Sequence, residues 1–190
     1  MHRMIAYGPT EMASAFRTVR KNTLQIAEEI PEQQYDFVPA PGVRTVSDLL
    51  RHMAFAPRFW LDMQRDKRVA TLQGYDFGVI LGRLSALEQQ PKTKAEIVEL
   101  LKTEGEMFAT WLESLSTDFL AETFTDPMGQ NPKTRFENLL SVKEHEMHHR
   151  GQLMLIQRML GITPHLTRQR EERARARQAA AQPATAGANA

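Results

Sequence analysis

The sequence predicts an all-α protein, a four-helix bundle with long crossover connections. Four segments of about 20 residues carry apolar residues three and four positions apart, which is the period of one helix face. No part of the chain shows sustained apolar–polar alternation bounded by hairpin turns, the pattern of a half-buried strand. The connections between the four segments are too long for a minimal up-down-up-down bundle, so we expect some of them to cross over.

The first predicted helix begins after Thr10, whose hydroxyl can cap it, and runs to about Glu29. Pro31 follows as a stop signal, because proline cannot continue a helix without losing a backbone hydrogen bond. Residues 31–44 contain three prolines and a glycine and are expected to form an irregular connection.

The second predicted helix opens at Thr45 or Ser47 and continues to about Asp66. Pro57 lies well inside this segment, and a proline there removes one backbone hydrogen bond and predicts a kink. Residues 67–93 give a mixed signal, in which three glycines interrupt the pattern and the stretch FGVILGRLSALEQQ favours a short helix.

The last two predicted helices have the clearest apolar periods. One runs from Lys94 to about Ser116, and the other from near Thr134 to Leu160, with Gly161 and Pro164 supplying the C-terminal stop. The segment between them, residues 118–132, is rich in turn-forming residues and is expected to be a loop.

Composition bounds the class of protein. A chain of 190 residues is long enough for one domain with a full core, which we place at residues 1–166. The net charge of +1 commits the body neither to nucleic acid nor to an acidic membrane. No apolar run approaches the roughly 20 residues that cross a bilayer, and the N-terminus lacks the apolar core of a signal peptide, so a cytoplasmic protein is expected.

Residues 167–190 differ in composition from the rest of the chain. They are rich in arginine and alanine and offer no apolar stripe, so we expect a disordered tail, although the arginine-rich part could extend as a helix. A basic arm for nucleic acid is the functional alternative. Because the arginines alternate with glutamates and no aromatic residue accompanies them, a solvated tail is favoured and nucleic-acid binding is not expected.

The stretch EHEMHHRGQL, residues 144–153, carries the strongest functional signal. His145 and His149 are four positions apart, so on a helix they lie one above the other and can bind one metal ion. They also share a face with the apolar stripe and are therefore expected to point into the core. That face comprises Val142, His145, His149, Leu153, Ile156 and Leu160.

Two histidines supply too few ligands for a catalytic site, which normally has three protein ligands and an open position. His52 on the second helix is the third candidate, because it lies beside the apolar stripe and facing helices of a bundle are about 8–10 Å apart. The chain has no cysteine, so histidine and carboxylate are the possible transition-metal ligands. Zinc, nickel or ferrous iron would suit three histidines; the alternative is a set of hydrogen-bonded core histidines without metal.

Other polar residues near the pair receive structural interpretations. His148 points away from it, Glu144 and Glu146 lie on other faces and are expected to be solvated, and Gly151 in mid-helix favours the close approach of another helix. His2 and His165 near the chain ends are weaker ligand candidates. The two tryptophans, Trp60 and Trp111, are interpreted first as core residues.

With these residues in view, the chain resembles the DinB-like (damage-inducible, YfiT-related) family of metalloenzymes. The resemblance covers about residues 10–164, and its most specific part is the HHRGQ run with a histidine four positions before the second histidine of that run. It implies a four-helix bundle with long crossovers, often a homodimer, that holds a divalent metal with three histidines matching His52, His145 and His149. Arg150 and Gln152 match the family motif but have no firm catalytic role there.

The same resemblance implies a class of chemistry. Characterised relatives include thiol-dependent transferases and a maleylpyruvate isomerase that use bacillithiol, mycothiol or glutathione. Our first hypothesis is therefore a metal-dependent enzyme, a thiol-dependent transferase or a hydrolase, that acts on a small electrophilic substrate with a low-molecular-weight thiol as possible cofactor. The alternative is a non-catalytic, stress-associated metal-binding or interaction protein. No residue besides the ligands is assigned a catalytic role.

Overall fold

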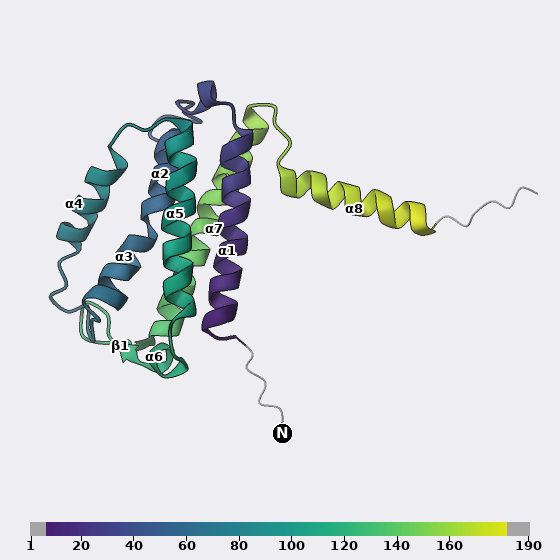
Figure 1. Cartoon of the computed structure of the whole chain (residues 1–190). Coiled ribbons are helices and arrows are strands. Elements are labelled where there is room, and N and C mark those ends of the chain that lie inside the picture. The colour runs from purple at the N-terminus through teal and green to yellow at the C-terminus, as the bar shows by residue number, and fades with distance from the viewer. Residues whose placement is uncertain (1–6, 182–190) are drawn as a thin grey trace, which may run out of the picture.

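The computed structural model describes residues 7–181 and shows the predicted four-helix bundle (Figure 1). The long helices are α1 (Pro9–Glu29), α5 (Lys94–Glu113), α7 (Arg135–Met159), and a composite of α2 (Val46–Phe55), α3 (Pro57–Leu61) and the π-helical turn η2 (Asp62–Asp66). The smaller elements are η1 (Glu32–Gln34), α4 (Phe77–Glu88), α6 (Thr117–Ala121), β1 (Thr123–Phe124) and β2 (Lys133–Thr134). A further helix, α8 (His165–Ala181), follows the bundle.

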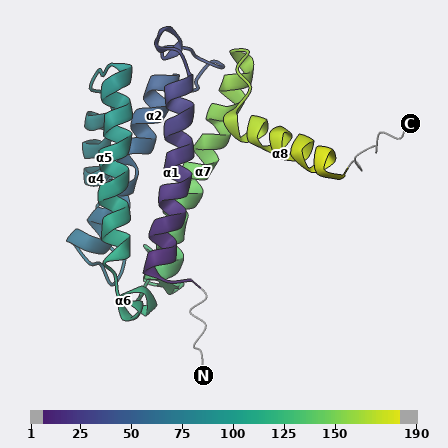
Figure 2. The same ribbon diagram turned by 45° about the vertical axis from the view of Figure 1, so that its right-hand side comes forward.

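The connections cross the ends of the bundle, as the sequence predicts. Helix α1 packs against α5 and α7, and α2 packs against the same two helices. Helices α1 and α2, although consecutive, are therefore diagonal to each other, and so are α5 and α7. The chain passes over one end of the bundle between α1 and α2 and over the other end between α5 and α7, as Figures 1 and 2 show.

Threonine side chains begin three of the bundle helices. The hydroxyls of Thr45, Thr93 and Thr134 each accept a hydrogen bond from the backbone N–H three residues later, at 3.0, 3.3 and 3.0 Å. Each bond satisfies an N–H that has no partner within the helix. Helix α1 instead begins at Pro9 after Gly8, so Thr10 is not its cap.

The second long helix breaks where proline predicts. Pro57 has no N–H to offer to the carbonyl of Met53, so α2 ends at Phe55 and α3 restarts after Ala56. The buried Arg20 of α1 supplies the missing donor: its Nη2 donates a hydrogen bond to the Met53 carbonyl at 3.0 Å. His52 lies before the break, in the straight part of α2.

The core has three apolar clusters; a small one lies between α2 and α4, and the two large ones lie inside the bundle with a polar layer between them. One large cluster joins Ile26, Leu50, Leu101 and Leu153, and the other joins Phe16, Leu61, Phe108 and Val142. Between them along the helices lie charged, hydroxyl and imidazole side chains. They are Arg20, Thr23, His52, Glu104, His145, Glu146 and His149. The candidate site therefore belongs to a polar layer at mid-height of the bundle.

One segment outside the bundle shows more structure than the sequence predicts, and another forms the short helix that the sequence favours. The expected loop 118–132 includes the end of α6 and the strand β1, which pairs antiparallel with β2 through Thr123 and Thr134. In the mixed region 67–93 the apolar stretch forms α4, which packs on α2 and α3.

Within residues 7–181 no helix is long and apolar enough to cross a membrane.

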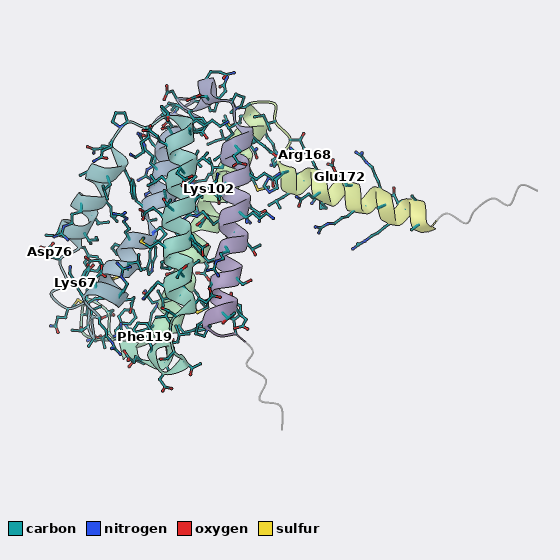
Figure 3. All side chains as sticks on the ribbon, viewed as in Figure 1. Lys67, Asp76, Lys102, Phe119, Arg168 and Glu172 are labelled. Atoms are coloured by element: carbon teal, nitrogen blue, oxygen red, sulfur yellow. The ribbon has the colours of Figure 1, made fainter. Side chains whose placement is uncertain are left out.

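Helix α8 occupies residues 165–181, where we expected disorder from residue 167 on. Alanine, arginine, glutamine and glutamate are strong helix formers, and no glycine or proline interrupts them before Pro183. The helix leaves the bundle at an angle in both views, and Figure 3 places Glu172 to the side of the bundle. The predicted disorder of residues 182–190 lies outside the described residues.

Candidate metal centre

Three imidazole rings meet in the polar layer, and they are the three that the sequence singles out. The Nε2 atom of His145 lies 3.1 Å from Nε2 of His52 and 3.1 Å from Nε2 of His149. One ring nitrogen from each histidine lies within 4.8 Å of the others. The structure thus joins an i,i+4 pair on α7 to a single histidine from the facing helix α2.

Two of the rings have a side-chain oxygen, a hydrogen-bond acceptor, next to Nδ1, the ring nitrogen that faces away from the other histidines. Oε1 of Glu88 lies 2.9 Å from Nδ1 of His52, and Oε1 of Gln152 lies 2.8 Å from Nδ1 of His149. In both rings Nδ1 therefore carries the proton, and the lone pair of Nε2 faces the other histidines. Such outer contacts fix the orientation and tautomer of metal-binding histidines.

This arrangement tests whether the residues fit a metal ion. The Nε2 lone pairs of His52 and His149 both aim at Nε2 of His145, which can carry at most one proton and so satisfy one of them. A cation among the three nitrogens would accept all three lone pairs. Around a tetrahedral zinc ion with bonds of about 2.0–2.1 Å, two nitrogens lie about 3.3 Å apart, close to the observed 3.1 Å. The donor set fits a divalent transition metal.

The surroundings keep two of the rings neutral, which is the form that binds metal. Burial, together with the neighbouring His149 and His52, lowers the pKa of His145 to about 4. Burial also lowers the pKa of His149, although its hydrogen bond to Gln152 acts in the opposite direction. Both imidazoles are therefore uncharged at neutral pH and need lose no proton to coordinate an ion.

The remaining histidines lie outside this group. His148 is exposed, and its Nε2 lies 3.3 Å from the amide nitrogen of Gln152. His165 is buried beside α1, where its Nε2 lies 3.1 Å from Oδ1 of Asn22, so its place near a chain end did not make it exposed. His2 lies outside the described residues.

Two structural interpretations of residues near the pair were wrong. Glu146 is not solvated: it is 2 % exposed and bound by Arg20 at 2.9 Å and by the hydroxyl of Thr23 at 2.8 Å. Gly151 faces open space, with nothing within 4 Å of the position of an added Cβ. The close approach occurs instead at Gly105, where Cγ of Arg20 would lie 2.9 Å from such an atom.

Two open hollows flank the histidines. A hollow of about 480 Å³ lies beside His149, between α7 and the connection that precedes α2. Another of about 320 Å³ lies beside His52 and His145, between α2 and α4, and Trp60 forms part of its wall. Trp60 and Trp111 are partly buried against the core, as expected, and Trp60 also faces the site.

Sequence reasoning missed the residues that support the ligands. Glu88 comes from the end of α4, a segment with three preceding glycines and a weak period, and nothing in the sequence aligns it with His52. Gln152 could have been found, because three residues after His149 is a helical neighbour. The local sequence therefore indicates a neighbour for His149 but none for His52.

Comparison with known proteins agrees with this architecture. The family model described as the DinB superfamily matches residues 15–153, most of the chain and all three histidines. The chain belongs to the DinB superfamily. The uncharacterized DinB-like protein YjoA of Bacillus subtilis (strain 168) is 23 % identical over 154 residues, which span 80 % of this chain and 91 % of YjoA.

Three solved structures share the fold at low sequence identity. YjoA superposes with a TM-score of 0.60 and 24 % identity over 80 % of this chain and 93 % of its own. A DinB-like protein from Bacillus cereus superposes with a TM-score of 0.60 and 20 % sequence identity, over 81 % of this chain and 93 % of its own. YfiT from Bacillus subtilis superposes with a TM-score of 0.60 and 17 % sequence identity, over 86 % of this chain and 95 % of its own. It is described as "a probable metal-dependent hydrolase with an unusual four-helix bundle topology".

Proposed function

We propose that this DinB protein is a metal-dependent enzyme in which His52, His145 and His149 hold one divalent ion. The observation that carries the proposal is the convergence of three Nε2 atoms, two of them with tautomers set by Glu88 and Gln152. Three imidazoles suit zinc, nickel or ferrous iron, and the chain has no thiolate to favour another metal.

The reaction we propose is attack of a thiol or of water on a small electrophile. A divalent ion with three imidazole ligands lowers the pKa of a thiol or water that joins it and so supplies a nucleophile near neutral pH. The chain's own part is to hold the rings: Glu88 and Gln152 keep a proton on each Nδ1, and the hollows on both sides admit reactants. A low-molecular-weight thiol is the expected cofactor of the transferase reaction.

The ligand count favours catalysis over a purely structural ion. Structural zinc sites normally have four protein ligands, whereas catalytic sites have three and leave a position open. Among residues 7–181 the group contains three histidines and no carboxylate or fourth histidine. The description of YfiT as a probable metal-dependent hydrolase supports the same direction.

Elemental analysis tests the metal centre. We expect about one equivalent of zinc, nickel or iron in untagged protein, and a loss of most of it in His149→Ala. His148→Ala is the matched control, since this neighbour is exposed and outside the group. A wild-type protein that neither contains nor takes up a divalent metal would overturn the proposal.

Turnover then tests catalysis and separates the two nucleophiles. Metal-loaded protein is assayed with chlorodinitrobenzene and a small thiol, where the thiolate forms a C–S bond and chloride leaves, and with nitrophenyl acetate, where water cleaves the ester. Activity in either assay that disappears in His149→Ala supports the enzyme. Metal-loaded protein without activity toward any such electrophile would favour the non-catalytic alternative.

A further inference from the structure

Arg44 lies where the two hollows beside the histidines meet. It lines the hollow next to His149 and also the hollow next to His52 and His145. Its side chain is exposed and forms neither an ion pair nor a hydrogen bond with any side chain in residues 7–181. A guanidinium group with its donors free therefore stands at the entrance to the candidate metal centre.

The backbone around Arg44 fixes its place. The residue directly precedes Thr45, which caps α2, the helix that carries His52. Gly42, two residues earlier, turns the connection with a φ of +77°, a conformation that residues with a side chain rarely adopt.

The walls of the hollows show what kind of molecule would fit beside this charge. The larger hollow is mainly aliphatic, with Leu155, Ile156 and Met159 of α7 opposite Val43. The smaller one is walled by Phe59 and Trp60 as well as Leu81 and Leu84. These surfaces favour a small ligand that is mainly apolar.

The positive charge beside the two hollows suits a ligand with a single negative charge. Among the described residues that line the two hollows, Arg44 is the only arginine or lysine. Glu88, the acidic residue of the smaller hollow, faces Nδ1 of His52. A phosphate dianion would find a single cation here, whereas a carboxylate can be bound by one guanidinium through two parallel hydrogen bonds.

We propose that Arg44 binds the carboxylate of a small, mainly apolar ligand that lies in these hollows with its reacting atom at the histidines. The inference rests on the proposed function for its view of the histidines as the reacting centre, and it adds the class of substrate. The carboxylate belongs either to the electrophile or to the thiol, and both sources place the same group on Arg44.

The first experiment needs no metal. Metal-free protein is titrated by calorimetry with phenylbutyrate and with phenylbutanol, which share an apolar body and differ in the charged group. We expect phenylbutyrate to bind about tenfold or more tightly, since a hydrogen-bonded charge pair has that effect. Arg44→Gln should remove this advantage and leave phenylbutanol unchanged, whereas Arg44→Lys should retain part of it.

Arg83→Gln is the matched control, because Arg83 is exposed and lines a different hollow, on the far side of α4. It should bind both probes as wild type does. Equal affinity of wild type for the two probes, an advantage that persists in Arg44→Gln, or no measurable binding of phenylbutyrate would each overturn the inference.

A second titration uses zinc-loaded protein and identifies which reactant carries the carboxylate. Mercaptopropionate is compared with mercaptopropanol in wild type and Arg44→Gln. A loss of about tenfold or more in Arg44→Gln for mercaptopropionate places the charge on the thiol; a loss for phenylbutyrate alone places it on the electrophile. A protein that takes up no zinc but still prefers phenylbutyrate through Arg44 would overturn the proposed function and leave this inference standing.

Discussion

At the scale of single residues, Glu88 has the clearest role outside the ligands themselves. Its carboxylate lies 2.9 Å from Nδ1 of His52 and so turns Nε2 toward His145. We expect Glu88→Ala to weaken zinc binding by about 10–100-fold, the usual cost of removing such an outer contact. The measurement is a competition titration against a chromophoric chelator.

Glu144→Ala is the control for this prediction, because Glu144 is exposed on the same helix as two ligands but faces away from them. Its zinc affinity should equal that of wild type. Glu88→Gln should fall between the two, since its amide oxygen can still accept the proton of Nδ1. An Ala variant at position 88 with unchanged zinc affinity would contradict the role.

The same scale shows why the ligands could be predicted and Glu88 and Arg44 could not. His145 and His149 share one helix, so their spacing alone determines that they are neighbours. His52 required only that a second inward histidine sit on a facing helix. Glu88 ends a short helix with a weak period and Arg44 lies in an irregular connection, so their positions depend on how those segments pack.

At the scale of helices, Arg20 joins all four members of the bundle. From α1 it binds Glu146 of α7 at 2.9 Å and donates to the carbonyls of Leu101 on α5 and Met53 on α2, both at 3.0 Å. Its side chain is almost fully buried. We expect Arg20→Met to lower the free energy of unfolding by about 3–5 kcal/mol, because it leaves Glu146 buried without its partner.

Urea unfolding of two further variants checks this explanation. Arg17 lies one turn earlier on the same helix and forms exposed ion pairs with Glu106 and Glu113, so Arg17→Met should cost at most about 1 kcal/mol. The double variant Arg20→Met with Glu146→Gln should recover part of the lost stability, because the stranded charge is gone. Similar costs for Arg17→Met and Arg20→Met would show that the buried pair has no special role.

Replacing each of two mid-helix glycines by alanine should change the stability of the protein in opposite directions. Gly151→Ala adds a methyl group to open space on α7 and should stabilise the protein by roughly 0.5–1 kcal/mol. Gly105→Ala should destabilise it, because the new Cβ would lie 2.9 Å from Arg20 and displace the buried side chain that joins the helices. Thermal unfolding of both variants measures the two effects, and destabilisation by Gly151→Ala would contradict the helical explanation.

Helix boundaries follow the local signals closely where one cause dominates. The break at Pro57 and the beginnings at Thr45 and near Thr134 follow from one missing N–H and from side-chain caps. Most of helix α6 and the strand β1 lie in a stretch that we predicted as a loop. Strand β1 pairs with β2 through residues nine and eleven positions apart, which a local pattern does not reveal.

At the scale of the whole molecule, the crossovers bring the histidines together. Because α2 and α7 are adjacent in space but separated in sequence by α4 and α5, His52 faces His145 and His149 across the polar layer. The apolar clusters above and below that layer hold the helices in register without contributing ligands. The homodimer implied by the family resemblance stays a prediction, which light scattering of the purified protein would check.

The attachment of α8 leads to a last prediction. Its first turn contacts α1, where His165 is buried beside Asn22 and Arg168 pairs with Glu29 at 2.5 Å, and Figure 3 shows Glu172 already to the side of the bundle. Deleting residues 171–190 should therefore change stability by less than about 0.5 kcal/mol. Deleting residues 165–190 should cost roughly 1–3 kcal/mol, because a buried ring and its hydrogen bond are lost. Equal unfolding curves for the two truncations would show that His165 and Arg168 do not anchor α8.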